Sequence, residues 1–188
     1  MRRGTIARCA GLLAVCLFTS TPVLRGQALT DAVAGPVIDA YGHVYPVTDP
    51  DFRTETQRMY RAVFDVSAAP PETDALNARI ETVARFLNMH ARAGVPRGNM
   101  RLALVLHGSA GKDALSHEAY RARFGTDNPN LEMLEALHDA GVSILLCGQT
   151  AVHRGFNREE LAPPIKVALS AMTALVTLQA EGYALIAF

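Results

Sequence analysis

The sequence predicts an α/β protein with a mostly parallel sheet of about five strands. Beyond residue 60, short apolar runs alternate with stretches of helical periodicity, as is typical of strands joined by crossover helices. One run, Val142–Leu146, is almost wholly apolar, which fits a strand buried on both faces. Residues 29–59 show neither the two-residue period of a strand nor the 3.6-residue period of a helix, and they are rich in Gly, Pro and Asp. They are therefore expected to form an irregular N-terminal arm, held to the domain by Tyr41, Tyr45 and Phe52.

The first strand, helix and second strand are expected between residues 61 and 106. Arg61–Val66 has the composition of a strand. Apolar residues then recur every three or four positions from Leu76 to Ala91, which indicates one buried helix face, and Gly94 can end that helix in the left-handed conformation. Leu102–Leu106 supplies the second strand.

A polar stretch with no clear element follows, and the next helix is expected only at Asn130. This residue is a good N-cap for a helix that carries leucines at 131, 134 and 137 and ends at Gly141. Val142–Leu146 is then the third strand, and Cys147 follows it directly.

The last quarter of the chain predicts a short helix and one further crossover. Asn157 and Glu160 have the spacing of a capping box. A brief strand is expected at Lys166–Leu169, a helix at Ser170–Gln179, and a final strand at Tyr183–Phe188.

The first 28 residues have the pattern of a signal peptide. Three arginines precede the apolar stretch Cys9–Phe18, which is too short to span a bilayer, so we expect export to the periplasm or medium without stable membrane insertion. A retained anchor is the alternative. Small residues at Gly26 and Ala28 place the predicted mature start at Leu29.

Removal of residues 1–28 changes both the charge and the cysteine count. The remaining 160 residues make one ordinary domain and hold 14 basic against 18 acidic residues, a net charge of −4. This balance argues against a nucleic-acid partner. Cys147 becomes the only cysteine, so no intramolecular disulfide can form.

Two strand-end loops are the candidate sites, because ligands of parallel sheets bind at the carboxyl ends of strands. One contains His107, Gly108 and Ser109, and the other begins Cys147-Gly148-Gln149 and continues to His153 and Arg154. Positive groups or loop amides would favour a partly accessible Cys147 thiolate. A cysteine that ends an apolar strand is also often a packing residue, so this alternative stays open. No pair has the spacing of a zinc site, and we expect no metal.

Four segments carry a resemblance to a known family. They are LALVLHGSA (102–110), FGTDNPNLEML (124–134), GVSILLCGQTAVHRG (141–155) and VALSAMTALVTLQAEGYALI (167–186). Over about residues 60–188 the chain resembles the DsrE/DsrF-like sulfur-relay family, in its exported single-domain branch. The resemblance implies a flavodoxin-like three-layer fold and assembly into homo- or hetero-oligomers. A homo-oligomer is expected here, because the arm and the uncharged last strand Tyr183–Phe188 are apolar enough to leave an open sheet edge that needs cover. It also implies that Cys147 receives sulfane sulfur as a persulfide, with His107 and Gln149 in the pocket loops.

The expected partners are sulfur donor and acceptor proteins or small thiols, with no metal, flavin or nucleotide cofactor. Whether the protein turns over as a sulfurtransferase or acts only as a carrier is left open. The alternative from another class is a non-catalytic module that binds a small anion or supports assembly, with Cys147 as a buried structural residue.

The first prediction concerns the leader. Because the apolar stretch is too short to remain as a stable span, the exported protein should begin at Leu29. N-terminal sequencing of the periplasmic protein tests this. An uncleaved Met1, or a start at Cys16, would contradict it.

Overall fold

The computed structural model describes Met1 and residues 32–187. The predicted signal peptide, residues 1–28, and the predicted mature start at Leu29 therefore lie outside the described residues, Met1 excepted. Among the residues that are described, no helix is both long and apolar enough to cross a membrane.

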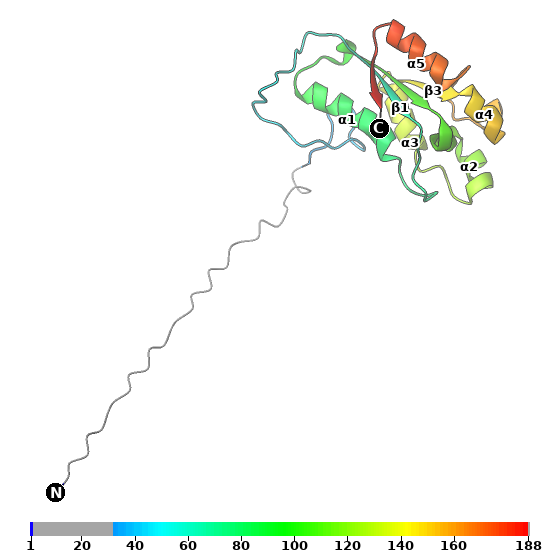
Figure 1. Ribbon diagram of the computed structural model, residues 1–188, viewed down its shortest axis with the longest axis horizontal. Coiled ribbons are helices and arrows are strands. Elements are labelled where there is room, and N and C mark those ends of the chain that lie inside the picture. The colour runs from blue at the N-terminus through cyan, green and yellow to red at the C-terminus, as the bar shows by residue number, and fades with distance from the viewer. Residues whose placement is uncertain (2–31, 188) are drawn as a thin grey trace. The chain divides into compact units, whose positions relative to one another are not determined.

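A five-stranded sheet forms the centre of the fold (Figure 1), and all its strands are parallel, in the spatial order β4-β3-β2-β1-β5. The strands are β1 (Tyr60–Val66), β2 (Met100–Leu106), β3 (Ser143–Cys147), β4 (Ile165–Ala168) and β5 (Ala184–Ala187). The α-helices are α1 (Ala78–Arg92), α2 (His117–Phe124), α3 (Leu131–Asp139), α4 (Gly148–Arg154) and α5 (Ala171–Ala180). Three 3-10 segments are η1 (Arg97–Asn99), η2 (Gly108–Ala114) and η3 (Arg158–Glu160).

The two faces of the sheet are covered very differently. Strands β1 to β4 follow one another in one direction across the sheet, and helices α1 and α3 pack on one face. The chain then returns from β4 to β5 at the far edge through α5, which lies on the opposite face. A right-handed crossover that reverses direction must change face in this way. Helix α5 is thus the main cover of a second, smaller core.

Strand pleating divides the residues of each strand between these two faces. In β2, Leu102, Leu104 and Leu106 enter the larger core under α1 and α3. Ala103 and Val105 point the other way and pack beneath α5, as does Cys147 at the end of β3. The α5 face of the sheet is therefore the face on which any strand-end chemistry of Cys147 takes place.

The predicted fold class and all five strands are confirmed, each within one or two residues. Sequence periodicity missed α2, because HEAYRARF buries only Ala119 and Tyr120 fully, with Phe124 packed partly buried against the same core. It also missed η2 and α4, which are short. Asn130 does precede α3 but its side chain does not cap the helix; its Oδ1 accepts a hydrogen bond from the Asn77 backbone N–H, at 2.7 Å.

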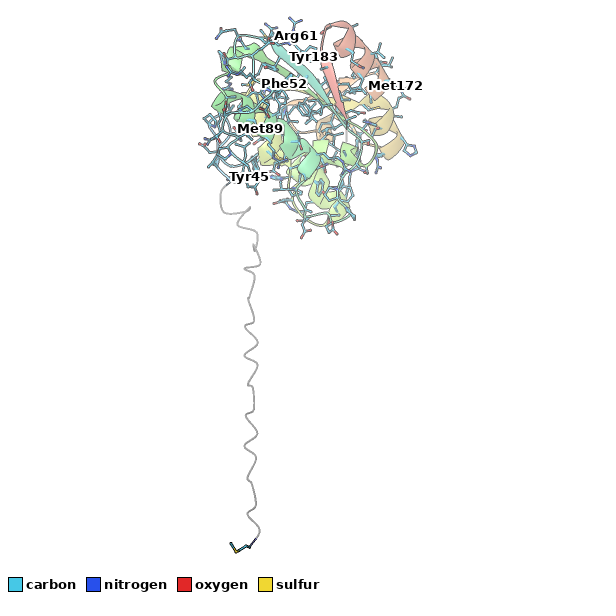
Figure 2. All side chains as sticks on the ribbon, turned by 60° about the vertical axis from the view of Figure 1, so that its left-hand side comes forward. Tyr45, Phe52, Arg61, Met89, Met172 and Tyr183 are labelled. Atoms are coloured by element: carbon cyan, nitrogen blue, oxygen red, sulfur yellow. The ribbon has the colours of Figure 1, made fainter. Side chains whose placement is uncertain are left out.

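The arm is held by hydrogen bonds from its backbone to side chains of α1 rather than by the expected aromatic residues. Tyr41 does pack against the larger core, but Tyr45 and Phe52 are 49% and 93% exposed, so the prediction was wrong for these two. Figure 2 shows both near Met89 on the outside of the chain. The actual anchor is Asn88 of α1, which is fully buried.

The Asn88 amide satisfies five backbone groups of the arm. Its Oδ1 accepts from the N–H groups of Val37 and Ile38 at 3.1 and 3.0 Å. Its Nδ2 donates to the carbonyls of Ile38, Tyr41 and Gly42 at 2.9 to 3.0 Å. Because these groups are withdrawn from water, this side chain is the main anchor of the arm. Two other side chains of α1 assist: Arg92 Nε donates to the Gly35 carbonyl at 2.9 Å, and Glu81 Oε1 accepts from the Gly42 N–H at 3.1 Å.

We predict that Asn88→Ala loosens the arm and lowers the free energy of unfolding by about 3 kcal/mol or more, since several buried backbone groups lose their partners. Chemical denaturation measures the loss, and limited proteolysis should cut within residues 32–47. Arg85→Ala is the matched control on the same helix: it removes a single hydrogen bond to the arm, 3.3 Å long, to the His43 carbonyl, together with an ion pair to Glu81 at 3.6 Å. Equal effects of the two variants would contradict this account.

Candidate functional site

Three polar side chains lie at the carboxyl ends of three neighbouring strands. Asp65 is near the end of β1, His107 directly follows β2, and Cys147 ends β3. Asp65 lies two residues after Val63, and His107 lies two residues after Val105; both valines pack beneath α5. Strand alternation therefore brings all three to the α5 face.

The three residues line one cavity of 310 Å³. Residues near the start of α5 and the first turn of α4 complete its wall: Gln149, Ser170, Ala171, Met172 and Leu175. Cys147 itself is only 6% exposed, which is more buried than the partial accessibility expected from the sequence. The sulfur is reached through this cavity rather than from an open surface.

The surroundings of Cys147 favour its anionic form. Burial raises the pKa of the thiol, but hydrogen bonds from the Thr150 backbone N–H and hydroxyl and from the Ala171 and Gln149 N–H groups outweigh it, so the pKa lies below its ordinary value. Cys147 is the N-cap residue of α4, so the Gln149 and Thr150 amides belong to the first turn of the helix that follows it, although its side chain forms no standard helix cap. The Ala171 amide comes from the first residue of α5.

The position of α5 over Cys147 depends on Gly148. A Cβ at this residue would lie 2.6 Å from the Ala168 carbonyl oxygen and 3.1 Å from that of Leu169. The sequence suggested that Gly148 admits a partner's backbone; the structure shows that it admits the β4–α5 connection of the same chain. Ser170 then begins α5, and its Oγ accepts from the Thr173 N–H at 3.0 Å.

His107 is paired with a carboxylate that sequence analysis did not select. Its Nε2 lies 2.7 Å from Oδ1 of Asp65, and the two side chains are 28% and 24% exposed. The bond to Asp65 uses Nε2, so the other ring nitrogen, Nδ1, is not engaged by this carboxylate. Asp65 is the one charged residue in AVFDV, on the same side as Val63, and period-two alternation was the signal that could have found it.

The other predicted site residues fall into two groups. The Gly108 N–H donates to Thr150 Oγ1 at 3.2 Å, so it supports the hydroxyl that in turn bonds Cys147. Ser109 Oγ accepts from the Ala69 N–H at 2.9 Å and holds the β1–α1 connection. His153 and Arg154 are exposed in the last turn of α4; they do not line the cavity and are not among the groups that lower the Cys147 pKa.

Within residues 32–187, no group of three or more His, Cys, Asp or Glu side chains is arranged to hold a metal ion. The cavity instead offers a thiol of lowered pKa, an imidazole with its carboxylate, and the side chain of Gln149. These groups suit reactions at sulfur in which a proton also moves.

Fold and site together define a small parallel α/β protein with a stabilised thiolate at a strand end. The chain belongs to the DsrE/DsrF-like family, whose family model matches residues 61–188. This match confirms the resemblance predicted from the four sequence segments. A search of curated proteins finds no match.

Two solved structures share the fold. One is a protein of unknown function, MTH1491, from Methanobacterium thermoautotrophicum, and the other is the ychN protein from E. coli. Each is 19% identical with a TM-score of 0.52 and aligns with 69% of this chain; the alignments cover 99% and 100% of those chains. They support the flavodoxin-like fold and, at this identity, the fold alone.

We predict that Thr150→Val moves the alkylation of Cys147 to higher pH, whereas Thr150→Ser does not, because only the Val variant loses the hydroxyl that bonds the sulfur. Iodoacetamide reacts with the thiolate, so the wild-type rate should rise at lower pH than that of an unperturbed cysteine. Loss of one hydrogen bond to a charged group should slow the Val variant about tenfold near pH 7.

The ionisation of Cys147 should also make the free energy of unfolding depend on pH. The folded-state pKa is lowered, so the thiolate stabilises the fold fully above the unfolded-state pKa, and this contribution is lost as the pH falls through the folded-state value. Alkylation profiles that coincide for wild type and Thr150→Val would contradict the assigned hydroxyl.

Proposed function

We propose that this protein handles sulfane sulfur in the periplasm: Cys147 accepts the sulfur as a persulfide and passes it to an acceptor thiol. The observation that carries the proposal is the position of Cys147 at the end of β3, in a cavity shared with the starts of α4 and α5, where nearby amides and a hydroxyl lower its pKa. Membership of the DsrE/DsrF-like family supports a sulfur-relay role. The exported location rests on the predicted leader.

The proposed chemistry is an exchange at sulfur. The Cys147 thiolate attacks the outer sulfur of a donor persulfide, and a new sulfur–sulfur bond forms as the donor's own sulfur–sulfur bond breaks. The electrons of the broken bond go to the donor sulfur, which takes a proton and leaves as a thiol. In the second half, an acceptor thiolate attacks the outer sulfur carried by Cys147 and restores the Cys147 thiolate. Both halves are redox neutral and need no cofactor.

The hydrogen bonds at Cys147 suit both halves of this exchange. A lowered pKa favours the ionised form that attacks and makes Cys147 a better leaving group on delivery. A cysteine that served only to fill the core would have a raised pKa, because burial in an apolar site opposes ionisation. Here burial is outweighed by three amides and one hydroxyl, an arrangement that packing does not require.

We also propose that the surface around the cavity meets other proteins, either a sulfur partner or a second copy of this chain. Leu169, Met172 and Val176 are 73%, 74% and 67% exposed near the start of α5, and Figure 2 shows Met172 on the side away from Met89 and the arm. Exposed apolar residues that adjoin a reactive site commonly mark an interaction surface.

Intact mass spectrometry tests the sulfur function. The purified, reduced protein should gain the mass of one sulfur atom after brief exposure to an alkyl persulfide, and should lose it again on addition of an excess of acceptor thiol. Cys147→Ala should gain nothing and should remain folded.

The alternative, a structural Cys147 in an anion-binding or assembly module, predicts the opposite. In that case the wild type would gain no sulfur, and Cys147→Ala would be clearly destabilised through a small cavity. That pair of results would rule out the proposed function.

A further inference from the structure

We propose that Asp65 and His107 form a proton-transfer pair for the partner's sulfur, which leaves when Cys147 attacks a donor and arrives as a thiol when an acceptor attacks the sulfur held by Cys147. His107 is assigned as the catalytic acid and base at the departing or arriving sulfur, and Asp65 as its positioning residue. For its physiological substrate this inference rests on the proposed sulfur function. The acid and base role itself applies to any sulfur–sulfur exchange at Cys147.

The placement of the pair is the first support. His107 and Cys147 follow adjacent strands and line the same cavity, so a molecule whose sulfur contacts Cys147 also lies beside the imidazole. The Asp65 carboxylate lies 2.7 Å from Nε2 on the neighbouring strand. Neither side chain is deeply buried, and the larger core does not require either of them.

The division of labour within the cavity is the second support. Cys147 is already favoured as an anion by amides and a hydroxyl, so His107 is not needed to deprotonate it. What lacks help is the other sulfur: an alkyl thiolate has a conjugate acid pKa of about 8.5, and such groups leave slowly unless they are protonated.

No other residue that lines the cavity fits this task. Asp65, His107 and Cys147 are its titratable residues. Ser170 Oγ is engaged with Thr173, and the Gln149 side-chain amide donates to the Leu169 carbonyl at 3.4 Å. Histidine is the side chain that gives and takes a proton most readily near neutral pH.

The proposed step exchanges one sulfur–sulfur bond for another. The Cys147 sulfur donates an electron pair to the sulfur under attack, the old sulfur–sulfur bond breaks, and its electrons go to the departing sulfur. The imidazolium of His107 gives its Nδ1 proton to that sulfur and becomes neutral, with Nε2–H still donated to Asp65. On delivery, neutral His107 takes the proton of the arriving thiol, and the Asp65 carboxylate stabilises the imidazolium that forms.

The test compares two disulfides that differ in their leaving group. One is bis(2-hydroxyethyl) disulfide, which releases an alkyl thiolate, and the other is a nitro-substituted aromatic disulfide, which releases a weakly basic thiolate that leaves without protonation. Second-order rate constants for the reduced full chain at pH 7 are measured for wild type, His107→Gln and Asp65→Asn. His138→Gln, on the exposed surface of α3, is the matched control.

We expect His107→Gln to slow the alkyl reaction by about a hundredfold and Asp65→Asn by about tenfold, with the aromatic reaction changed by less than about threefold. The aromatic rate also reports that each variant is folded and that Cys147 is intact. Equal slowing of both reactions would overturn the proposal, because it would mean that the pair acts on Cys147 itself. No slowing of the alkyl reaction, or no alkyl reaction in the wild type, would overturn it too.

This outcome is separable from that of the sulfur function. A protein that shows the leaving-group contrast but gains no sulfur from a persulfide would support the proton-transfer pair and rule out the proposed substrate. A protein that gains sulfur but shows no leaving-group contrast would support the proposed substrate and rule out the proton-transfer pair.

Discussion

The close contact between Gly148 and the β4–α5 connection is the constraint on which the rest of the site depends. With no side chain at 148, the Ala168 carbonyl can approach the end of β3, and α5 begins directly over Cys147. That placement brings the Ala171 amide to the sulfur from one side while α4 supplies the Thr150 and Gln149 amides from the other. The thiolate is thus stabilised by two helices that meet at one point, and Ser170 fixes the start of the second.

The two strand-end loops behave as one unit because Thr150 joins them. Its hydroxyl accepts from the Gly108 N–H and bonds the Cys147 sulfur, so the loop that carries His107 is tied to the helix that carries the thiolate bonds. Asp65 of β1 connects a third strand to this unit through its hydrogen bond with His107. A shift of the loop after β2 would therefore change both the hydrogen bonds at Cys147 and the position of the His107 imidazole. The thiol and the proposed proton carrier would move together.

Sequence reasoning reached the fold class, the strands and Cys147, because each leaves a local pattern: apolar runs, helical spacing, and a lone cysteine at a strand end. It did not reach Asp65, whose role depends on strand order, since β1 lies beside β2 only in the folded sheet. Tyr45 and Phe52 were misassigned because the arm is held by the amide of Asn88, and a single polar residue within a helix face carries no sequence signal of its partners. The roles suggested for His153 and Arg154 are filled by backbone amides, which any sequence supplies.

Burial and reactivity are compatible at Cys147 because the groups that favour the anion are fixed amides rather than mobile charges. Amide bonds to sulfur strengthen when water is removed, since the local dielectric constant falls. Helix α5 carries no charged residue, and Leu169 and Met172 leave apolar surface beside the cavity. A protein that covered this surface would exclude water from the cavity, and would thereby strengthen both the bonds to the thiolate and the His107–Asp65 pair during the proposed sulfur exchange.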